Sequence, residues 1–142
     1  MIVRRILAAS DGTDASLRGV AAAADIATCC AAELVLMTAI PIPQHVVTAA
    51  KLDGGTIEHY IERMAAEALC ACIAMLKERR VGAAVKVLIG NLAESVVGEA
   101  AVQRVDLVVM GRGRRVEPKD LVLGSSSDRI ARSLAVPILL IP

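Results

Sequence analysis

The stretch Val105-Asp-Leu-Val-Val-Met110, followed at once by Gly111-Arg-Gly113-Arg-Arg115, decides the fold class of this chain. An aliphatic run that stops at two closely spaced glycines is typical of a buried strand that ends in a loop. Farther on, Gly124-Ser-Ser-Ser127 opens a helical pattern, and Val136-Pro-Ile-Leu-Leu-Ile141 is a second aliphatic run. The stretch therefore predicts a strand, a glycine-rich loop, a helix and another strand.

The glycines and serines of this loop also predict a site for phosphate, as part of a nucleotide. Glycine lets the backbone approach a ligand, and serines that open a helix offer N–H groups and hydroxyls to an anion. Arg112, Arg114 and Arg115 lie in the same loop, with Lys119 nearby. These cations either contact a phosphate or form an ordinary solvated loop, and the sequence leaves both interpretations open. The loop lacks the P-loop pattern and the dinucleotide fingerprint.

The same alternation of strands and helices continues through the rest of the chain. Aliphatic runs predict strands over residues 2–9, 33–40, 84–89, 107–110 and 136–141. Helical periodicity predicts helices over 14–30, 56–80, 92–103 and 126–134, whereas 41–55 is expected to be irregular. This order predicts an α/β, Rossmann-like fold: one domain over residues 1–142, with a five-stranded parallel sheet in the order 3-2-1-4-5 and helices on both faces.

Two candidate site residues follow the carboxyl ends of different strands. Asp11 follows the first strand and Gly111 the fourth. Ligands of such sheets bind outside the carboxyl ends of strands where the strand order reverses, so the two residues are expected to converge. Asp11 either orders the turn and the helix that follows it, or accepts hydrogen bonds from a ribose or base.

The composition restricts the classes of partner. Hydrophobic residues make up 56% of the 142 residues, yet Phe and Trp are absent and Tyr60 is the single Tyr. An aliphatic core suits a parallel sheet, and the lack of stacking aromatics argues against a nucleic-acid partner. With a formal net charge of +1 and no uncharged apolar segment of roughly 18 residues, we expect no membrane association and a cytoplasmic protein. The four cysteines lack metal-site spacing and are expected to be buried, reduced thiols.

Three stretches spread over the length of the chain form a recognisable combination. The first is Ile6-Leu-Ala-Ala-Ser-Asp11-Gly12-Thr13 with its alanine-rich helix. The second is Val87-Leu-Ile-Gly90 leading to Asp106-Leu-Val-Val-Met-Gly111, and the third is Gly124-Ser125 with Ala135-Val-Pro-Ile-Leu-Leu-Ile141. Together they resemble a single-domain universal stress protein of the A type. That resemblance implies an adenine-nucleotide alpha-hydrolase-like fold.

The resemblance also implies a set of site residues. The nucleotide-binding branch of that family carries Gly-x2-Gly-x9-Gly-Ser/Thr, and Gly111 with Gly124-Ser125 has the right separation here. The middle glycine is replaced by Arg114, while a glycine stands one place early at Gly113. Either Gly113 takes over in a shifted loop, Arg114 contacts phosphate through its guanidinium, or the site is lost. The resemblance implies Asp11 at the nucleoside, backbone atoms of Ala39 at adenine, and Gly111, Gly124, Ser125 and Ser126 at the phosphates, with ATP as ligand and Mg²⁺ accompanying it.

The last predicted strand has a consequence for assembly. Residues 136–141 are aliphatic and would lie at a sheet edge, which invites pairing with another strand. A two-fold homodimer through Val136 to Ile141 satisfies that edge, as in members of the family, and shielding within the monomer is the alternative. We expect an ATP-binding regulator or adaptor with an unknown protein partner. The alternatives are an interaction module without nucleotide and a protein with slow ATP hydrolysis or autophosphorylation; the sequence shows no positioned general base.

Overall fold

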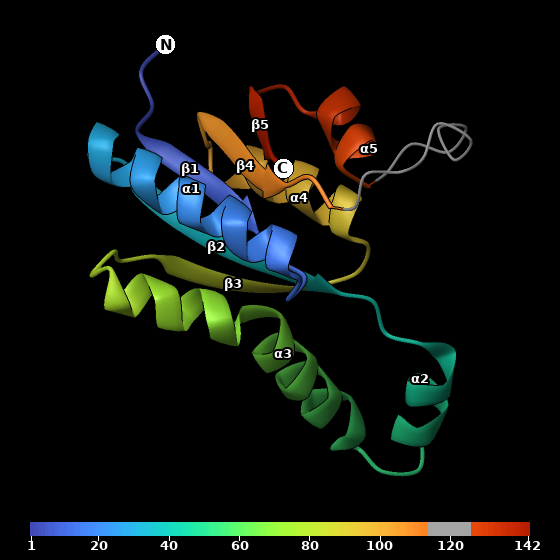
Figure 1. Cartoon of the computed structure of the whole chain (residues 1–142). Helices are drawn as coiled ribbons and strands as arrows, with labels where there is room; N and C mark the ends of the chain where they lie inside the picture. Colours follow the sequence, from blue (N-terminus) through green and yellow to red (C-terminus); the bar gives the residue numbers. More distant parts are fainter. Residues whose placement is uncertain (114–125) are drawn as a thin grey trace.

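The computed structural model describes residues 1–113 and 126–142, in which strands and helices alternate (Figure 1). The elements follow one another as β1 (Arg5–Ala9), α1 (Asp14–Cys30), β2 (Glu33–Ile40), α2 (Gln44–Ala50), α3 (Thr56–Glu78), β3 (Ala84–Ile89), α4 (Leu92–Val102), β4 (Leu107–Gly111), α5 (Ser126–Ser133) and β5 (Ile138–Ile141). Within these residues, five strands form one parallel sheet in the order β3-β2-β1-β4-β5. The predicted fold class and strand order are confirmed.

The core lies in two layers, one on each face of the sheet. On one face, Ile6 and Ala8 of β1 pack with α1 and α3, and on the other, Leu7 and Ala9 pack with α4 and α5. Successive strand residues point to opposite faces, so a strand covered on both sides must be apolar at every position. This double burial explains why the strands read as continuous aliphatic runs.

Two glycines allow α1 to lie directly on the end of β4. A Cβ on Gly19 would be 2.4 Å from the backbone N of Gly111, and a Cβ on Gly111 would be 2.0 Å from the carbonyl O of Ala15. Both distances are below the 3.0 Å that real Cβ contacts essentially never undercut. The beginning of α1 and the end of β4 are therefore held in backbone-to-backbone contact, which brings the residues after β1 close to those after β4.

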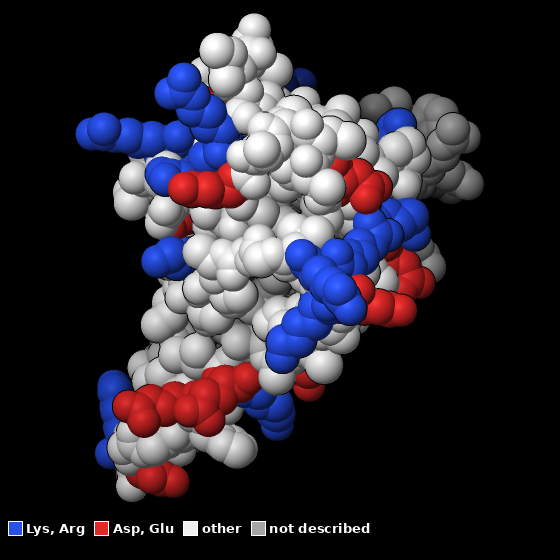
Figure 2. Space-filling model, turned by 90° about the vertical axis from the view of Figure 1, so that its left-hand side faces the viewer, with Lys and Arg blue, Asp and Glu red and all other residues white. Residues whose placement is uncertain are grey.

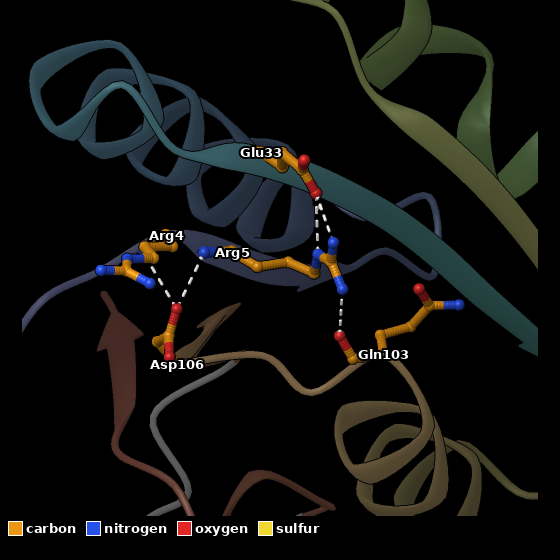
Figure 3. A network of polar contacts seen from close by, with 5 residues as sticks. All are labelled: Arg4, Arg5, Glu33, Gln103 and Asp106. Carbon is orange, nitrogen blue, oxygen red and sulfur yellow. Dashed lines mark hydrogen bonds and ion pairs between the residues drawn. The ribbon is translucent and has the colours of Figure 1, made fainter.

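A polar network joins the amino ends of β1, β2 and β4, at the end of the sheet away from the contact between Gly19 and Gly111 (Figure 3). The carboxylate of Asp106 accepts hydrogen bonds from the backbone N–H groups of Arg4 and Arg5, at 2.8 and 2.9 Å. The Arg5 guanidinium pairs with Glu33 at 2.7 Å and donates to the Gln103 carbonyl at 2.6 Å. The two backbone donors hold the pKa of Asp106 below its usual value. These contacts tie together the starts of β1, β2 and β4.

One helix appears where the sequence predicted irregular structure. The segment 41–55 contains α2, so that prediction was wrong for Gln44–Ala50. α2 follows Pro41 and Pro43 and has no side-chain cap; instead the Pro43 carbonyl accepts from the N–H groups of Val46 and Val47, at 3.0 and 3.2 Å. Val46 is buried, and α2 packs against α3. Tertiary packing of this kind stabilises a helix of weak local propensity, and it cannot be recognised from the sequence of the segment by itself.

The environment of the cysteines also differs from the prediction. Cys72 is buried, but Cys29, Cys30 and Cys70 are exposed, so the prediction of buried thiols was wrong for three of the four. Cys29 and Cys30 end α1 beyond its last buried residue, Ala27. Burial of apolar residues along a helix is restricted to one stripe, and these thiols lie outside it.

The surface carries both signs of charge. On the face shown in Figure 2, Lys and Arg side chains lie beside Asp and Glu side chains, in keeping with the formal net charge of +1. Among the residues that the structure describes, no helix is both long enough and apolar enough to cross a membrane.

Candidate functional site

An open pocket of about 310 Å³ lies at the carboxyl ends of β1 and β4. Its volume falls at the lower end of the range of small-molecule sites, roughly 300–1,000 Å³. Four segments contribute to it: the end of β1 with the start of α1, the start of α4, the end of β4, and the start of α5. The residues that line it are Ala9, Asp11, Thr13, Ala15, Ser16, Leu92, Met110, Gly111, Arg112, Gly113, Ser126 and Ser127. The strands β1 and β4 pair directly, so the predicted convergence of Asp11 and Gly111 is confirmed.

Asp11 is held by hydroxyl groups from the first turn of α1. Its Oδ1 accepts hydrogen bonds from Ser16 Oγ at 2.5 Å, from Thr13 Oγ1 at 2.6 Å and from the Thr13 N–H at 3.0 Å. Thr13 is also the N-cap of α1 and accepts from the Ser16 N–H. Burial alone would raise the pKa of Asp11, but these hydrogen bonds outweigh it and leave the pKa below its usual value. Asp11 is therefore a fixed negative charge at neutral pH.

The β4 side of the pocket consists of Gly111, Arg112 and Gly113. Gly111 was predicted to leave room for a ligand, yet the nearest atoms to its missing Cβ belong to Ala15 and Ser16 of α1. The lack of a side chain at Gly111 thus serves helix packing. Gly113 has φ +75°, with no atom within 4 Å of a built Cβ among the described residues. Gly113 therefore has a backbone conformation that favours glycine.

Two helices begin at this pocket. Thr13, Ala15 and Ser16 belong to the start of α1, and Ser126 and Ser127 open α5. Ser127 is buried, whereas Ser126 is exposed. The first turn of a helix has unpaired N–H groups and the positive end of the helix dipole, which favours negative charge nearby. Both helix starts carry acidic residues, but Asp11 lines the pocket, whereas Asp128 in the first turn of α5 is not among its lining residues. The α5 side is therefore the more favourable position for a second anion.

The predicted site residues fall into three groups. Asp11, Gly111, Gly113 and Ser126 line the pocket together. Ala39 lies near the carboxyl end of β2, paired with Leu88 of β3, and is not among the pocket-lining residues. Arg114, Gly124 and Ser125 lie outside the described residues, as do Arg115 and Lys119.

Two residues that line the pocket, Ser16 and Thr13, were not predicted as site residues from the sequence. Ser16 was not singled out, although its hydroxyl donates to Asp11 and accepts from the Asp11 N–H at 3.1 Å. Thr13 was noted only as the end of the stretch Ile6 to Thr13. The signal was present in the spacing, because an Asp two residues before a capping Thr and five before a Ser allows both hydroxyls to reach one carboxylate. Among the described residues, no group of three His, Cys, Asp or Glu is placed to hold a metal ion.

Comparison with known proteins agrees with this architecture. The chain matches the model of the Universal stress protein family over residues 3–142, and no curated protein matches it. A universal stress protein solved in complex with cAMP is 23% identical with a TM-score of 0.68, over 99% of this chain and 98% of its own. UspA from Lactobacillus plantarum is 18% identical with a TM-score of 0.72, over 100% and 99%. The Archaeoglobus fulgidus protein in complex with dAMP is 16% identical with a TM-score of 0.68, over 100% of both chains. Since the family model spans almost the whole sequence, this chain belongs to the universal stress protein family.

Proposed function

We propose that this universal stress protein binds an adenine nucleotide, with ATP as its ligand, in the pocket between β1, β4, α1 and α5. One observation carries the proposal. The Asp11 carboxylate, held by hydrogen bonds, and the start of α5 line the same pocket at the carboxyl ends of the neighbouring strands β1 and β4. One wall of the pocket accepts hydrogen bonds and another offers N–H groups and hydroxyls. A nucleotide matches both walls, because its ribose hydroxyls donate hydrogen bonds and its phosphate oxygens accept them.

The charge of Asp11 sets the direction in which the nucleotide lies. Phosphates are repelled by this carboxylate and are assigned to the α5 side, at Gly113, Ser126 and Ser127, with Arg112 as the nearby cation. The ribose is assigned to Asp11, where a hydroxyl can donate to the carboxylate. By the family pattern, Ala39 lies toward adenine, and Arg114, Gly124 and Ser125 belong to the phosphate end. Mg²⁺ is expected to arrive with the phosphates, as nucleotide-bound Mg²⁺ usually keeps several water ligands.

Two structural neighbours support an adenine nucleotide as the ligand class. One was solved with cAMP and the other with dAMP, and each covers at least 98% of its own length in the comparison. Their identities of 23% and 16% make them a guide to the fold. The pocket supports a nucleotide, and the choice of ATP follows the resemblance to the nucleotide-binding branch of the family.

The nucleotide test is a calorimetric titration of the folded protein with ATP and Mg²⁺. Asp11→Asn keeps a carbonyl oxygen for Thr13 and Ser16 but removes the charge, so we expect ATP to bind about 10- to 100-fold more weakly, as for the loss of a hydrogen bond to a charged group. Asp106→Asn is the matched control, since its carboxylate also accepts backbone N–H groups but lies at the opposite edge of the sheet. It should leave ATP binding unchanged.

Each other outcome of the titration selects a different function. If the folded wild-type protein releases no heat of binding, the nucleotide proposal fails and the chain is an interaction module whose basic loop meets another protein. If ATP is consumed in a Mg²⁺-dependent reaction that Asp11→Asn abolishes, the protein is a slow ATPase or an autophosphorylating protein.

For assembly, we propose a cytoplasmic homodimer through β5 that acts as a regulator or adaptor. Both β3 and β5 are edge strands within the described sheet. β3 carries Lys86 at its centre, and a lysine is a common device against edge-to-edge pairing. The sequence of β5 is Ile-Leu-Leu-Ile without a charge, and Leu139 is 39% exposed. β3 exposes Val85, Val87 and Ile89 as well, so the choice of β5 for a second copy is based on its lack of a charged residue.

Two charge substitutions of matched exposure test this dimer. Leu139→Lys places a charge on β5, and Val87→Lys places one on β3, where the side chain is 40% exposed. Sedimentation analysis should show a dimer for the wild-type protein and for Val87→Lys, and a monomer for Leu139→Lys. A monomeric wild-type protein, or a dimer that only Val87→Lys disrupts, would contradict the assignment to β5.

A further inference from the structure

Ser10, the residue immediately before Asp11, is buried and makes hydrogen bonds in three directions. Its side chain is 1% exposed. The Oγ donates to the backbone carbonyl of Ala68 on α3 at 2.8 Å and accepts from the Gly12 N–H at 3.2 Å. It also accepts from the Cys72 thiol, at 3.4 Å. A single hydroxyl thus joins the turn after β1 to two residues of α3.

The same turn is in close contact with α3 at a second point. Gly12 has φ +86°, and a Cβ built on it would lie 2.8 Å from the carbonyl oxygen of Glu67. The turn therefore rests on the backbone of α3 over residues 67–68, with no side chain between them. The contact at Gly12 is a close packing of backbone atoms. The hydrogen bonds of Ser10, in contrast, are polar and directional.

From these contacts we infer that Ser10 is a positioning residue, which fixes the Asp11 carboxylate in the pocket by tying its turn to α3. The Asp11 backbone lies between two anchors: Ser10 holds the turn from the α3 side, and Thr13 and Ser16 hold the carboxylate from the α1 side. Removal of the Ser10 hydroxyl takes away both the donor to the Ala68 carbonyl and the acceptor of the Gly12 N–H, so the turn loses its side-chain hydrogen bonds to α3 and is free to shift. This inference rests on the proposed nucleotide site for its importance, but the position of Asp11 can be measured without any nucleotide.

The ionisation of Asp11 reports its position in the ligand-free protein. Hydrogen bonds from Ser16 and Thr13 hold the pKa of Asp11 below its usual value, against the effect of burial. If the turn shifts, these bonds weaken and the pKa of Asp11 rises. The other charges around it, Arg112 in the pocket, Asp14 on α1 and Glu67 on α3, are unchanged by a substitution at Ser10. The Cys72 thiol remains uncharged at neutral pH, because burial raises its pKa.

The experiment compares Ser10→Ala with Thr28→Ala in the full chain. Thr28 is a matched control, since its hydroxyl also donates to a helix carbonyl, that of Ala24 at 2.9 Å, but at the far end of α1. The Asp11 pKa is measured by NMR of its carboxyl carbon during a pH titration without nucleotide, and ATP affinity is then measured by calorimetry. We expect Ser10→Ala to raise the Asp11 pKa and to weaken ATP binding about five- to tenfold, the fold-change that one lost hydrogen bond produces. Thr28→Ala should leave both unchanged.

The outcomes separate this inference from the nucleotide proposal. A folded Ser10→Ala protein with the wild-type Asp11 pKa would overturn the positioning role, whatever the ATP affinity. A raised Asp11 pKa in a protein whose wild type binds no ATP would support the positioning role and refute the nucleotide proposal. If Ser10→Ala does not fold, Ser10→Cys in a Cys72→Ala background keeps a γ atom that forms weaker hydrogen bonds at this position and prevents a disulfide. Its weaker hydrogen bonds should raise the Asp11 pKa relative to Cys72→Ala alone, and an unchanged pKa would refute the inference.

Discussion

Replacement of Gly111 by alanine should destabilise the protein, because α1 occupies the space that a Cβ needs. The new Cβ would lie 2.0 Å from the Ala15 carbonyl oxygen and 2.8 Å from the Ser16 nitrogen. To bring the first distance from 2.0 Å to an ordinary 3.4 Å, the start of α1 must retreat by about 1.4 Å. Overpacking of this kind costs about 1–3 kcal/mol, and we expect the upper end because backbone atoms, not a flexible side chain, must move. For a chain of this size, that is a decrease in Tm of about 9 °C.

The assay is thermal and urea unfolding of Gly111→Ala beside Gly98→Ala. Gly98 lies within α4, and no atom in the described part of the chain lies within 4 Å of a Cβ built there. Alanine at Gly98 should therefore raise the free energy of unfolding by up to about 1 kcal/mol through helix propensity. The two variants add the same methyl group, so they separate steric conflict from the loss of glycine itself. A Gly111→Ala protein as stable as the wild type would refute the claim that this glycine exists for helix packing.

Three further predictions concern other parts of the structure. The Asp106 pKa is lowered by folding, so its stabilising effect is present above the ordinary carboxyl pKa and is lost as the pH falls through the lower folded value; urea unfolding at neutral and acidic pH should show a smaller acid-induced loss for Asp106→Asn than for the wild type. Asn91 caps α4 by accepting from two backbone N–H groups, at 2.9 and 3.2 Å. Asn91→Ala should lower the free energy of unfolding by about 1 kcal/mol and Tm by about 3 °C, and an unchanged Tm would argue against the cap. A thiol reagent should modify three cysteines in the folded protein and Cys72 only after unfolding, because Cys72 alone is buried; four reactive thiols in the native state would contradict its burial.

Most of the architecture could be predicted because the decisive signals are local. An aliphatic run such as Leu34 to Met37 is typical of a strand covered on both faces, and Gly111, the last residue of β4, marks where that strand ends. Right-handed crossovers then restrict the order of the strands. The approach of Asp11 to Gly111 followed from that order alone, which is why the location of the pocket could be predicted.

The errors arose where a distant contact decides the structure. The segment after Pro41 and Pro43 was predicted to be irregular, but it contains α2, which packs against α3. Gly111 was interpreted by its neighbours in sequence, whereas the atoms that require a glycine there belong to α1. The exposure of Cys70 depends on which stripe of α3 faces the sheet, and Ser10 gains its role from Ala68, 58 residues away. None of these pairings leaves a trace in local composition or periodicity.

The most direct test of the central claim is a titration of the isotope-labelled protein with ATP and Mg²⁺, followed by the backbone amide signals in NMR. Nucleotide binding in the proposed pocket predicts saturable shifts at Thr13, Ser16, Gly113 and Ser127, with no comparable change at Arg5 or Glu33 at the opposite edge of the sheet. An absence of shifts at saturating ATP, or shifts gathered around Arg5 and Glu33, would contradict the account.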